Sequence, residues 1–292
     1  MRLTAALAGI FPPAPENKRM KGGMNMATYG FIGVGNMGGA LARAVCRTAE
    51  PDEIFLANRT LEKAEALAEE LGCRVADNSA IAESADFIFL GVKPQMMEGL
   101  LTKISPLLAQ RKTRFVLVTM AAGLTVADIQ QMAGGAYPVI RIMPNTPCSI
   151  GEGMTLYACG AEVAEEEEKT FLSDMAGSGK LIALPEHLID AGSAVSGCGP
   201  AYVDLFLEAL ADGGVACGLP RAAAMELAAQ TVIGSARLQQ ESGAHPGVLK
   251  DAVCSPGGTT IQGVRALEQS GFRAAAMGAV IAAYEKTLAL KK

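Results

Sequence analysis

Short apolar runs separated by longer amphipathic stretches fill roughly the first two thirds of the chain. The apolar runs predict strands at residues 29–32, 54–57, 74–75, 87–90, 115–118, 139–142, 154–158 and 181–184. The stretches between them predict helices, among them 40–47, 61–71 and the acidic segment 162–173, whose charges we expect to be solvated. Strands that alternate with helices are typical of a mostly parallel sheet with helices on both faces.

The strand pattern ends near residue 188, and helical patterns follow. Glycine and proline separate five predicted helices at 200–217, 220–240, 246–253, 259–269 and 272–290. The segment 200–217 is apolar on most faces, which is too hydrophobic for the surface of a domain of about one hundred residues. We therefore expect a partner subunit to cover it, with Asp204, Glu208 and Asp212 as its solvated or interface-edge stripe.

A glycine motif stands between the first predicted strand and the first predicted helix. The motif reads Gly-Val-Gly-Asn-Met-Gly, and its spacing is that of a dinucleotide-binding turn. Gly33 forms the tight turn, Gly35 lets a pyrophosphate approach the backbone, and Gly38 lets the helix pack close to the strand. The predicted cofactor contacts here are Ile32, Gly33, Val34, Gly35, Asn36, Met37 and Gly38.

The end of the second strand indicates which dinucleotide binds. An NAD site usually has a carboxylate about 20 residues after the glycines, to bind the ribose 2′-hydroxyl. Here the chain has Asn58, Arg59 and Thr60, so a guanidinium and a hydroxyl are available to a 2′-phosphate. We predict NADPH, with NADH as the alternative. Asn58 and Thr60 can also serve as caps of the helix 61–71.

The remaining strand ends are short loops, and ligands of such sheets bind beyond the carboxyl ends of the strands. These ends are residues 91–94, 120–123 and 143–147. Lys93 is a candidate catalytic acid, and a phosphate or helix-end contact explains it equally well. Each of these loops is small or stiff, which suits close approach by a flat ring.

Composition narrows the class of protein. The length of 292 residues and 50% hydrophobic content suit about two domains, each with its own core. A net charge of −5 and 5% aromatic residues argue against a nucleic-acid or membrane-surface partner. Seven cysteines without a CxxC pair favour a reducing, cytoplasmic setting, and two histidines argue against a His-based metal site or a serine triad. No apolar run approaches the roughly 20 residues of a membrane helix.

These patterns give three parts. Residues 1–26 form an extension that we expect to be disordered, with Met24 and Met26 as candidate natural starts. Residues 27–188 form a Rossmann-type dinucleotide-binding domain of the α/β class. Residues 189–292 form an all-α domain for dimerisation and substrate binding.

The loop 255–260, Ser-Pro-Gly-Gly-Thr-Thr, is the candidate reaction site. Its glycines allow a ligand close to the backbone, and Thr259 and Thr260 can cap the helix that follows. Free N–H groups at a helix N-terminus can bind a carboxylate or phosphate. Taken alone, the loop is also explained by an ordinary helix entry after a turn.

The segment 246–268 resembles the signature of pyrroline-5-carboxylate reductase. Further blocks of the same likeness follow the family's order, at 33–38, 92–94, 121–123, 144–147 and 197–202. Three departures from the family pattern are the N-terminal extension, Thr259 in place of a frequent Ala, and Cys198 in place of a frequent Ser. None of them removes a group that the chemistry needs.

The resemblance implies reduction of L-1-pyrroline-5-carboxylate to L-proline with NAD(P)H, the last step of proline synthesis. It also implies that Asn58 and Asn78 contact the adenosine side of the cofactor. The residues that would line the cofactor's path to the nicotinamide are Val92, Lys93, Pro94, Met120, Ala121 and Ala122. The helical domain would pair subunits as an interlocked homodimer, which in many members assembles into a ring of dimers. One subunit's sheet would then meet its partner's 258–260 loop.

The residues agree with this chemistry. A cyclic imine accepts hydride when its nitrogen is protonated or hydrogen-bonded, and we assign that hydrogen bond to the Thr260 hydroxyl as the catalytic group. The loop N–H groups are the expected carboxylate site. The predicted substrate contacts are Val253, Gly258, Thr259 and Thr260. The alternatives are a related imine reductase, a 3-hydroxyacid dehydrogenase and a catalytically silent NADPH sensor. The dehydrogenase chemistry uses a lysine on the first helix of the second domain, and this sequence has no lysine between Lys180 and Lys250.

Overall fold

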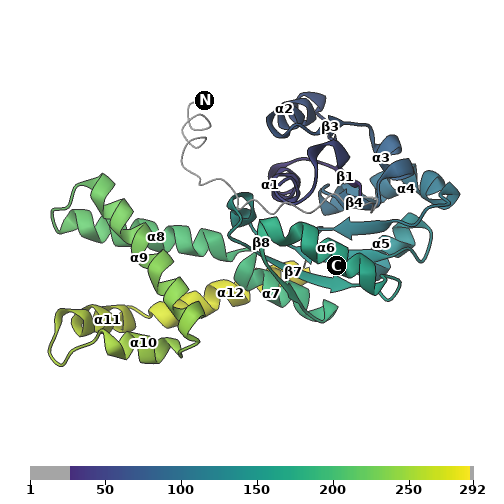
Figure 1. Cartoon of the computed structure of the whole chain (residues 1–292). Helices are drawn as coiled ribbons and strands as arrows, with labels where there is room; N and C mark the ends of the chain where they lie inside the picture. The colour runs from purple at the N-terminus through teal and green to yellow at the C-terminus, as the bar shows by residue number, and fades with distance from the viewer. Residues whose placement is uncertain (1–26, 290–292) are drawn as a thin grey trace. The chain divides into compact units, whose positions relative to one another are not determined.

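The structure, a computed structural model, describes residues 27–289, and these divide into two compact units between Ile189 and Asp190 (Figure 1). The expectation of a disordered extension concerns residues 1–26, which lie outside the described range. Each unit is described below by itself. Of the described helices, none combines the length and the apolar character that crossing a membrane requires.

The first unit contains an eight-stranded sheet with the order β3-β2-β1-β4-β5-β6-β7-β8. Pairing is parallel throughout except between β6 and β7, which confirms the mostly parallel sheet. The predicted strand at 115 begins one residue later, at Val116. The strands are β1 Tyr29–Ile32, β2 Ile54–Ala57, β3 Arg74–Val75, β4 Phe87–Leu90, β5 Val116–Thr119, β6 Val139–Met143, β7 Gly153–Cys159 and β8 Gly179–Ala183.

Six helices of this unit follow the strands in the expected alternation. The Thr125 hydroxyl caps α5 by accepting a hydrogen bond from the Asp128 N–H, and the Asp128 carboxylate accepts one from the Thr125 N–H at 2.8 Å. Gly72 ends α2 in the left-handed region, as a C-terminal glycine commonly does. The helices are α1 Asn36–Val45, α2 Leu61–Leu71, α3 Asn78–Ser84, α4 Pro94–Gln110, α5 Val126–Ala133 and α6 Glu165–Met175.

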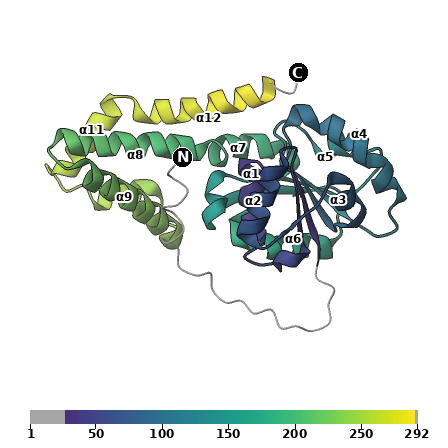
Figure 2. The same ribbon diagram turned by 90° about the horizontal axis from the view of Figure 1, so that it is seen from above.

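Alternation along β1 builds a core on each face of the sheet. Phe31 packs on the face covered by α1, α2 and α6, and its ring stacks on Phe89 with 4.4 Å between centroids. Ile32 points to the face covered by α3, α4 and α5, where Leu101 is fully buried. Figure 2 shows the two helix layers on either side of the sheet. Both faces are therefore covered, as the near-continuous apolar strands predict.

The described residues of the second unit form helices joined by turns, with no strand among them. The helix α7, Ile189–Ser196, was not among the predicted elements, and its small and polar residues explain why. The bounds of the other five helices lie within two residues of the predicted ones. The predicted last residue, 290, lies outside the described range. These five helices are α8 Gly199–Ala216, α9 Arg221–Ser242, α10 Pro246–Ala252, α11 Thr259–Gln269 and α12 Phe272–Ala289.

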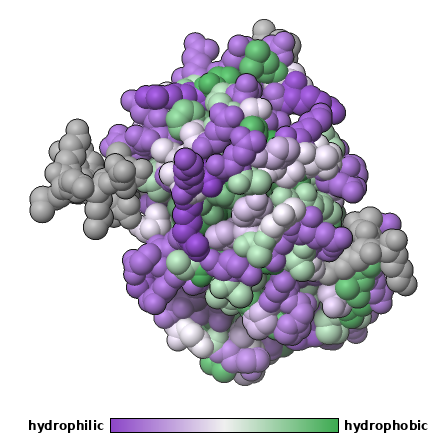
Figure 3. Space-filling model, turned by 90° about the vertical axis from the view of Figure 1, so that its right-hand side faces the viewer, coloured by the Kyte–Doolittle hydropathy of each residue, from purple (hydrophilic) through white to green (hydrophobic). Residues whose placement is uncertain are grey.

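The helical unit leaves much apolar surface uncovered within one chain. The fully or nearly buried residues at the α8–α9 contact are three alanines, Ala211, Ala224 and Ala228. By contrast, Leu205 of α8 is 68% exposed and Ile281 of α12 is 56% exposed. Figure 3 shows one face of the molecule, which is largely hydrophilic and has its apolar residues in small groups. Exposed apolar side chains on a helical unit are what a subunit interface requires before assembly.

The acidic positions of α8 are solvent-exposed in the single chain, as their four-residue spacing predicts. Asp212 forms an ion pair with Arg221 at the start of α9. This pair ties the two helices together at their connection. Because both partners are more than half exposed, the pair contributes little to stability.

Candidate functional site

Three glycines shape the turn between β1 and α1 by touching one another through their backbones. Gly33 has φ of +102°, which strains any residue with a side chain. A Cβ atom at Gly38 would lie 2.1 Å from the Gly33 carbonyl oxygen, and one at Gly91 would lie 2.2 Å from the same atom. Larger residues would therefore push α1 and the β4 end away from the turn.

Gly35 has a different reason for being glycine. It occupies the N-cap of α1 with φ −69° and ψ −163°, a conformation open to other residues, and a Cβ placed there would meet no atom within 4 Å. No side chain of the described residues caps this helix end. Because Gly35 has no side chain, the space in front of this helix N-terminus stays open. Such a space suits the pyrophosphate of a dinucleotide.

The residues after β2 remain accessible. The Asn58 side-chain amide donates to the Thr60 carbonyl oxygen at 2.9 Å, and Thr60 is the N-cap of α2 without a side-chain cap bond. Arg59 is exposed, and within residues 27–289 no carboxylate pairs with its guanidinium. A free guanidinium beside a strand end fits a phosphate group. Asn78 is the first residue of α3, one strand along, and is also exposed.

The other predicted cofactor loops lie at the same edge of the sheet, because parallel strands end together. Register pairs Ile32 with Ala57 and with Leu90, and Leu90 with Thr119. Loops 33–38, 58–60, 92–94 and 120–122 follow directly. The structure thus brings the predicted loops of the first unit together along one edge. Lys93, the N-cap of α4, is exposed there.

A buried charge that the sequence patterns do not predict lies in β6. Arg141 in β6 is 1% exposed, and its guanidinium lies 3.6 Å from Glu186 Oε1. The same carboxylate oxygen accepts the Val126 N–H at 2.6 Å, so it holds the start of α5. Arginine within the apolar run Val-Ile-Arg-Ile-Met was the available signal, since a charge buried in a strand requires a partner.

In the second unit the 255–260 loop leads from α10 into α11. Gly257 has φ of +69°, which strains any residue with a side chain, and a Cβ at Gly258 would lie 2.3 Å from Ser255 Oγ, which would have to rotate away. Gly258, not a threonine, is the N-cap of α11, because the helix already begins at Thr259. The expectation that Thr259 and Thr260 cap this helix is therefore wrong.

Some of the polar groups of this loop already have hydrogen-bond partners within the loop. The Gly258 N–H donates to the Ser255 carbonyl oxygen at 3.0 Å, so it is not the free donor that the sequence predicts. The Thr259 and Thr260 N–H groups donate to no turn or cap acceptor among the described residues. Thr260 is exposed, and so is Val253, at 64%. The helix end therefore offers two N–H groups and a hydroxyl to solvent.

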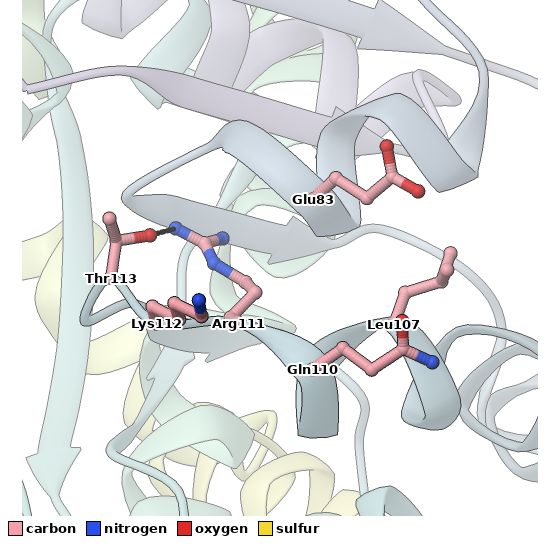
Figure 4. Close-up of a pocket in the computed structure, with 6 residues that line it drawn as sticks. All are labelled: Glu83, Leu107, Gln110, Arg111, Lys112 and Thr113. Atoms are coloured by element: carbon pink, nitrogen blue, oxygen red, sulfur yellow. Dashed lines mark hydrogen bonds between the residues drawn. The ribbon is translucent and has the colours of Figure 1, made fainter.

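A shallow pocket on the first unit lies elsewhere, where α4 ends before β5 (Figure 4). Its polar centre is Arg111, whose guanidinium donates to the carbonyl oxygens of Ala82 at 3.2 Å and Ala85 at 2.6 Å. It also donates to Thr113 Oγ1 at 3.0 Å. This arginine ties α3 to α4 at the amino edge of the sheet, opposite the predicted cofactor loops.

Comparison with known proteins agrees with the two units. The family "Pyrroline-5-carboxylate reductase dimerisation" matches residues 186–290, and "NADP oxidoreductase coenzyme F420-dependent" matches residues 28–123. Pyrroline-5-carboxylate reductase of Glycine max is 42% identical over 89% of this chain and 94% of its own length. The Escherichia coli K12 protein of the same name is 40% identical over 90% of this chain and 98% of its own.

A solved structure extends the likeness to three dimensions. Plasmodium falciparum pyrroline carboxylate reductase with NADP bound is 32% identical and superposes with a TM-score of 0.83, covering 92% of this chain and 100% of that one. Fold, order of domains and sequence agree over nearly the whole length. With relatives at about 40% identity along nine tenths of its length, this chain belongs to the pyrroline-5-carboxylate reductase family.

Proposed function

We propose that this protein reduces L-1-pyrroline-5-carboxylate to L-proline with NADPH, the last step of proline biosynthesis. The single observation that carries the proposal is the exposed helix N-terminus of α11, where two uncommitted N–H groups adjoin the free Thr260 hydroxyl in a chain of this family. These groups match a small molecule that has a carboxylate next to a ring nitrogen.

The cofactor-holding residues are those at the carboxyl edge of the sheet. The N-terminus of α1 receives the pyrophosphate, with contacts from residues 32–38, because Gly35 leaves the space open. Arg59 and Thr60 hold the 2′-phosphate, and Asn58 and Asn78 hold the adenosine. The loops 92–94 and 120–122 lead to the nicotinamide end. When bound, the reduced nicotinamide supplies the hydride for the C=N bond.

The 2′-phosphate contact is the reason to propose NADPH over NADH. A phosphate carries close to two charges, and a guanidinium binds it through paired hydrogen bonds. Because Arg59 forms no ion pair with the described residues, binding a phosphate would break no existing contact. A cofactor without this phosphate would leave the guanidinium in solvent and gain nothing from it.

The substrate is held by the α11 end. The Thr259 and Thr260 N–H groups bind its carboxylate, and Gly258 contributes close backbone approach in place of a hydrogen bond. The Thr260 hydroxyl hydrogen-bonds the ring nitrogen, where the charge changes during reduction. Val253, an exposed apolar side chain preceding the loop, contacts the ring carbons. Solvent supplies the proton to the imine, so no histidine is required.

The assembly is a homodimer at least. The exposed apolar residues of α8 and α12 support burial against a second copy of the helical unit, and the match to a dimerisation family supports the same partner. A ring of dimers is the larger assembly that we propose. The proposed location is the cytoplasm, since all seven cysteines are free in the described structure.

The test is direct. Purified protein is mixed with NADPH and pyrroline-5-carboxylate, the loss of reduced-cofactor absorbance is followed, and proline is identified by chromatography. We expect one proline formed for each NADPH consumed. NADPH that binds without turnover would support a sensor instead, and turnover of other cyclic imines in preference to pyrroline-5-carboxylate would assign a different reductase activity.

A further inference from the structure

Two cysteines of the first unit face each other at a distance that no sequence spacing indicates. Cys46 is the C-cap of α1, and Cys73 directly follows Gly72, the C-cap of α2. Their sulfur atoms are 3.3 Å apart, close enough for a thiol hydrogen bond. Both side chains are half-buried at the edge of the core, so a small reagent can reach them.

Backbone and side-chain contacts fix this approach. One helical turn before each cysteine, Arg43 of α1 and Glu70 of α2 form a two-pronged ion pair, with Nε to Oε1 at 2.8 Å and Nη2 to Oε2 at 2.6 Å. The Cys73 N–H donates to the Ala68 carbonyl oxygen at 3.0 Å, which the left-handed Gly72 makes possible. The same two helix ends are thus joined by a charged contact and a thiol contact in adjacent turns.

We propose that Cys46 and Cys73 form a redox-active dithiol that a small-molecule disulfide converts to an intramolecular disulfide bond. A disulfide needs its sulfurs about 2.05 Å apart, so the pair must close by about 1.2 Å. Rotation of the two half-buried side chains at the helix ends can bring the sulfur atoms this much closer. The inference concerns thiol chemistry alone and does not depend on the proposed reductase activity.

The reaction balances in two exchange steps. The Cys73 thiolate attacks one sulfur of the disulfide RSSR, which forms a Cys73–SR mixed disulfide and releases RS⁻. Cys46 then gives up its proton, and its thiolate attacks the Cys73 sulfur and releases the second RS⁻. Both leaving thiolates take up protons, so two electrons pass from the cysteines to RSSR and two RSH molecules result.

Either sulfur can donate in the contact between the two thiols. With Cys46 as the donor, the contact stabilises a Cys73 thiolate and lowers the pKa of Cys73, and the same contact, together with burial, raises the pKa of Cys46. Cys73 is therefore the attacking sulfur and Cys46 the resolving one. The bond would enclose residues 47–72, which include β2 and all of α2.

The experiment treats the full-length protein with bis(2-hydroxyethyl) disulfide, blocks remaining thiols by alkylation and analyses tryptic peptides without reduction. Trypsin releases Cys46 in peptide 44–47 and Cys73 in peptide 64–74. We expect these two peptides to appear covalently joined, with a mass two hydrogen atoms below their sum, and to separate after dithiothreitol. The protein should keep its single-chain mobility on a denaturing gel without reductant.

Two variants and a control sharpen the result. Cys46→Ser should leave Cys73 as a stable mixed disulfide, whereas Cys73→Ser should leave Cys46 largely unmodified, and Cys148→Ser, a change at a buried thiol elsewhere, should keep the joined peptides. Wild-type protein in which peptides 44–47 and 64–74 stay separately alkylated overturns the proposal, as does a link that joins two chains. Equal modification of Cys46 and Cys73 in the single variants overturns the assigned order.

Discussion

Replacing Thr260 by valine removes one hydroxyl and little else. The side chain is exposed at the second position of α11, and valine has nearly the same shape and a similar helix propensity. The hydroxyl has no hydrogen-bond partner among the described residues, so its loss breaks no internal contact. Stability should therefore stay the same. Any effect on catalysis then reports the bond from this hydroxyl to the substrate.

The size of the effect follows from that bond. A hydrogen bond to a charged group contributes about 1.5–3 kcal/mol, and each 1.4 kcal/mol is a factor of ten, so kcat/KM should fall by roughly tenfold to a hundredfold. Initial rates at low pyrroline-5-carboxylate and saturating NADPH measure it. Thr260→Ser should recover most of the activity, and Ser270→Ala, which removes a hydroxyl at the other end of the same helix, should change nothing. A Thr260→Val enzyme with wild-type kcat/KM would refute the assignment of this hydroxyl.

Three further changes test other parts of the account. Gly35→Ala introduces a methyl group where no protein atom lies within 4 Å, so the melting temperature should hold while the NADPH KM rises roughly tenfold or more in rate assays. Arg59→Ala should raise the NADPH KM by roughly tenfold and leave the NADH KM within about twofold, because only NADPH carries the 2′-phosphate; equal effects on both would remove Arg59 from that role. Leu205→Asp places a charge on a side chain that is 68% exposed in one chain, and light scattering should then show a smaller assembly than wild type.

The elements with the clearest periodicity could be predicted from sequence. The bounds of β1, β2 and α2 match residue for residue, because each has a strong apolar pattern with a clear stop. Helix α1 begins four residues earlier than predicted, because Gly38 and Gly39 lower helix propensity, although at Gly38 packing against the turn leaves no room for a side chain. The antiparallel pairing of β7 depends on long-range contacts that no local pattern encodes.

The candidate sites also divide into features that local sequence determines and features that depend on contacts between distant residues. The glycine turn could be predicted from the spacing of its glycines, and the contacts of Gly33 and Gly38 confirm a local steric demand at those two positions. The hydrogen bond from the Gly258 N–H to the Ser255 carbonyl oxygen could not be predicted from the sequence, because it depends on the conformation of the turn between them. The Cys46–Cys73 contact joins residues 27 positions apart and exists only once α1 and α2 pack together.

The most direct measurement is a crystal structure of the protein with L-proline and oxidised NADP bound. We expect the proline carboxylate within hydrogen-bond distance of the Thr259 and Thr260 N–H groups and its ring nitrogen beside Thr260 Oγ, with the nicotinamide ring against the proline ring. Proline bound at any other loop, or with Thr260 Oγ beyond hydrogen-bond reach of the ring nitrogen, would contradict it.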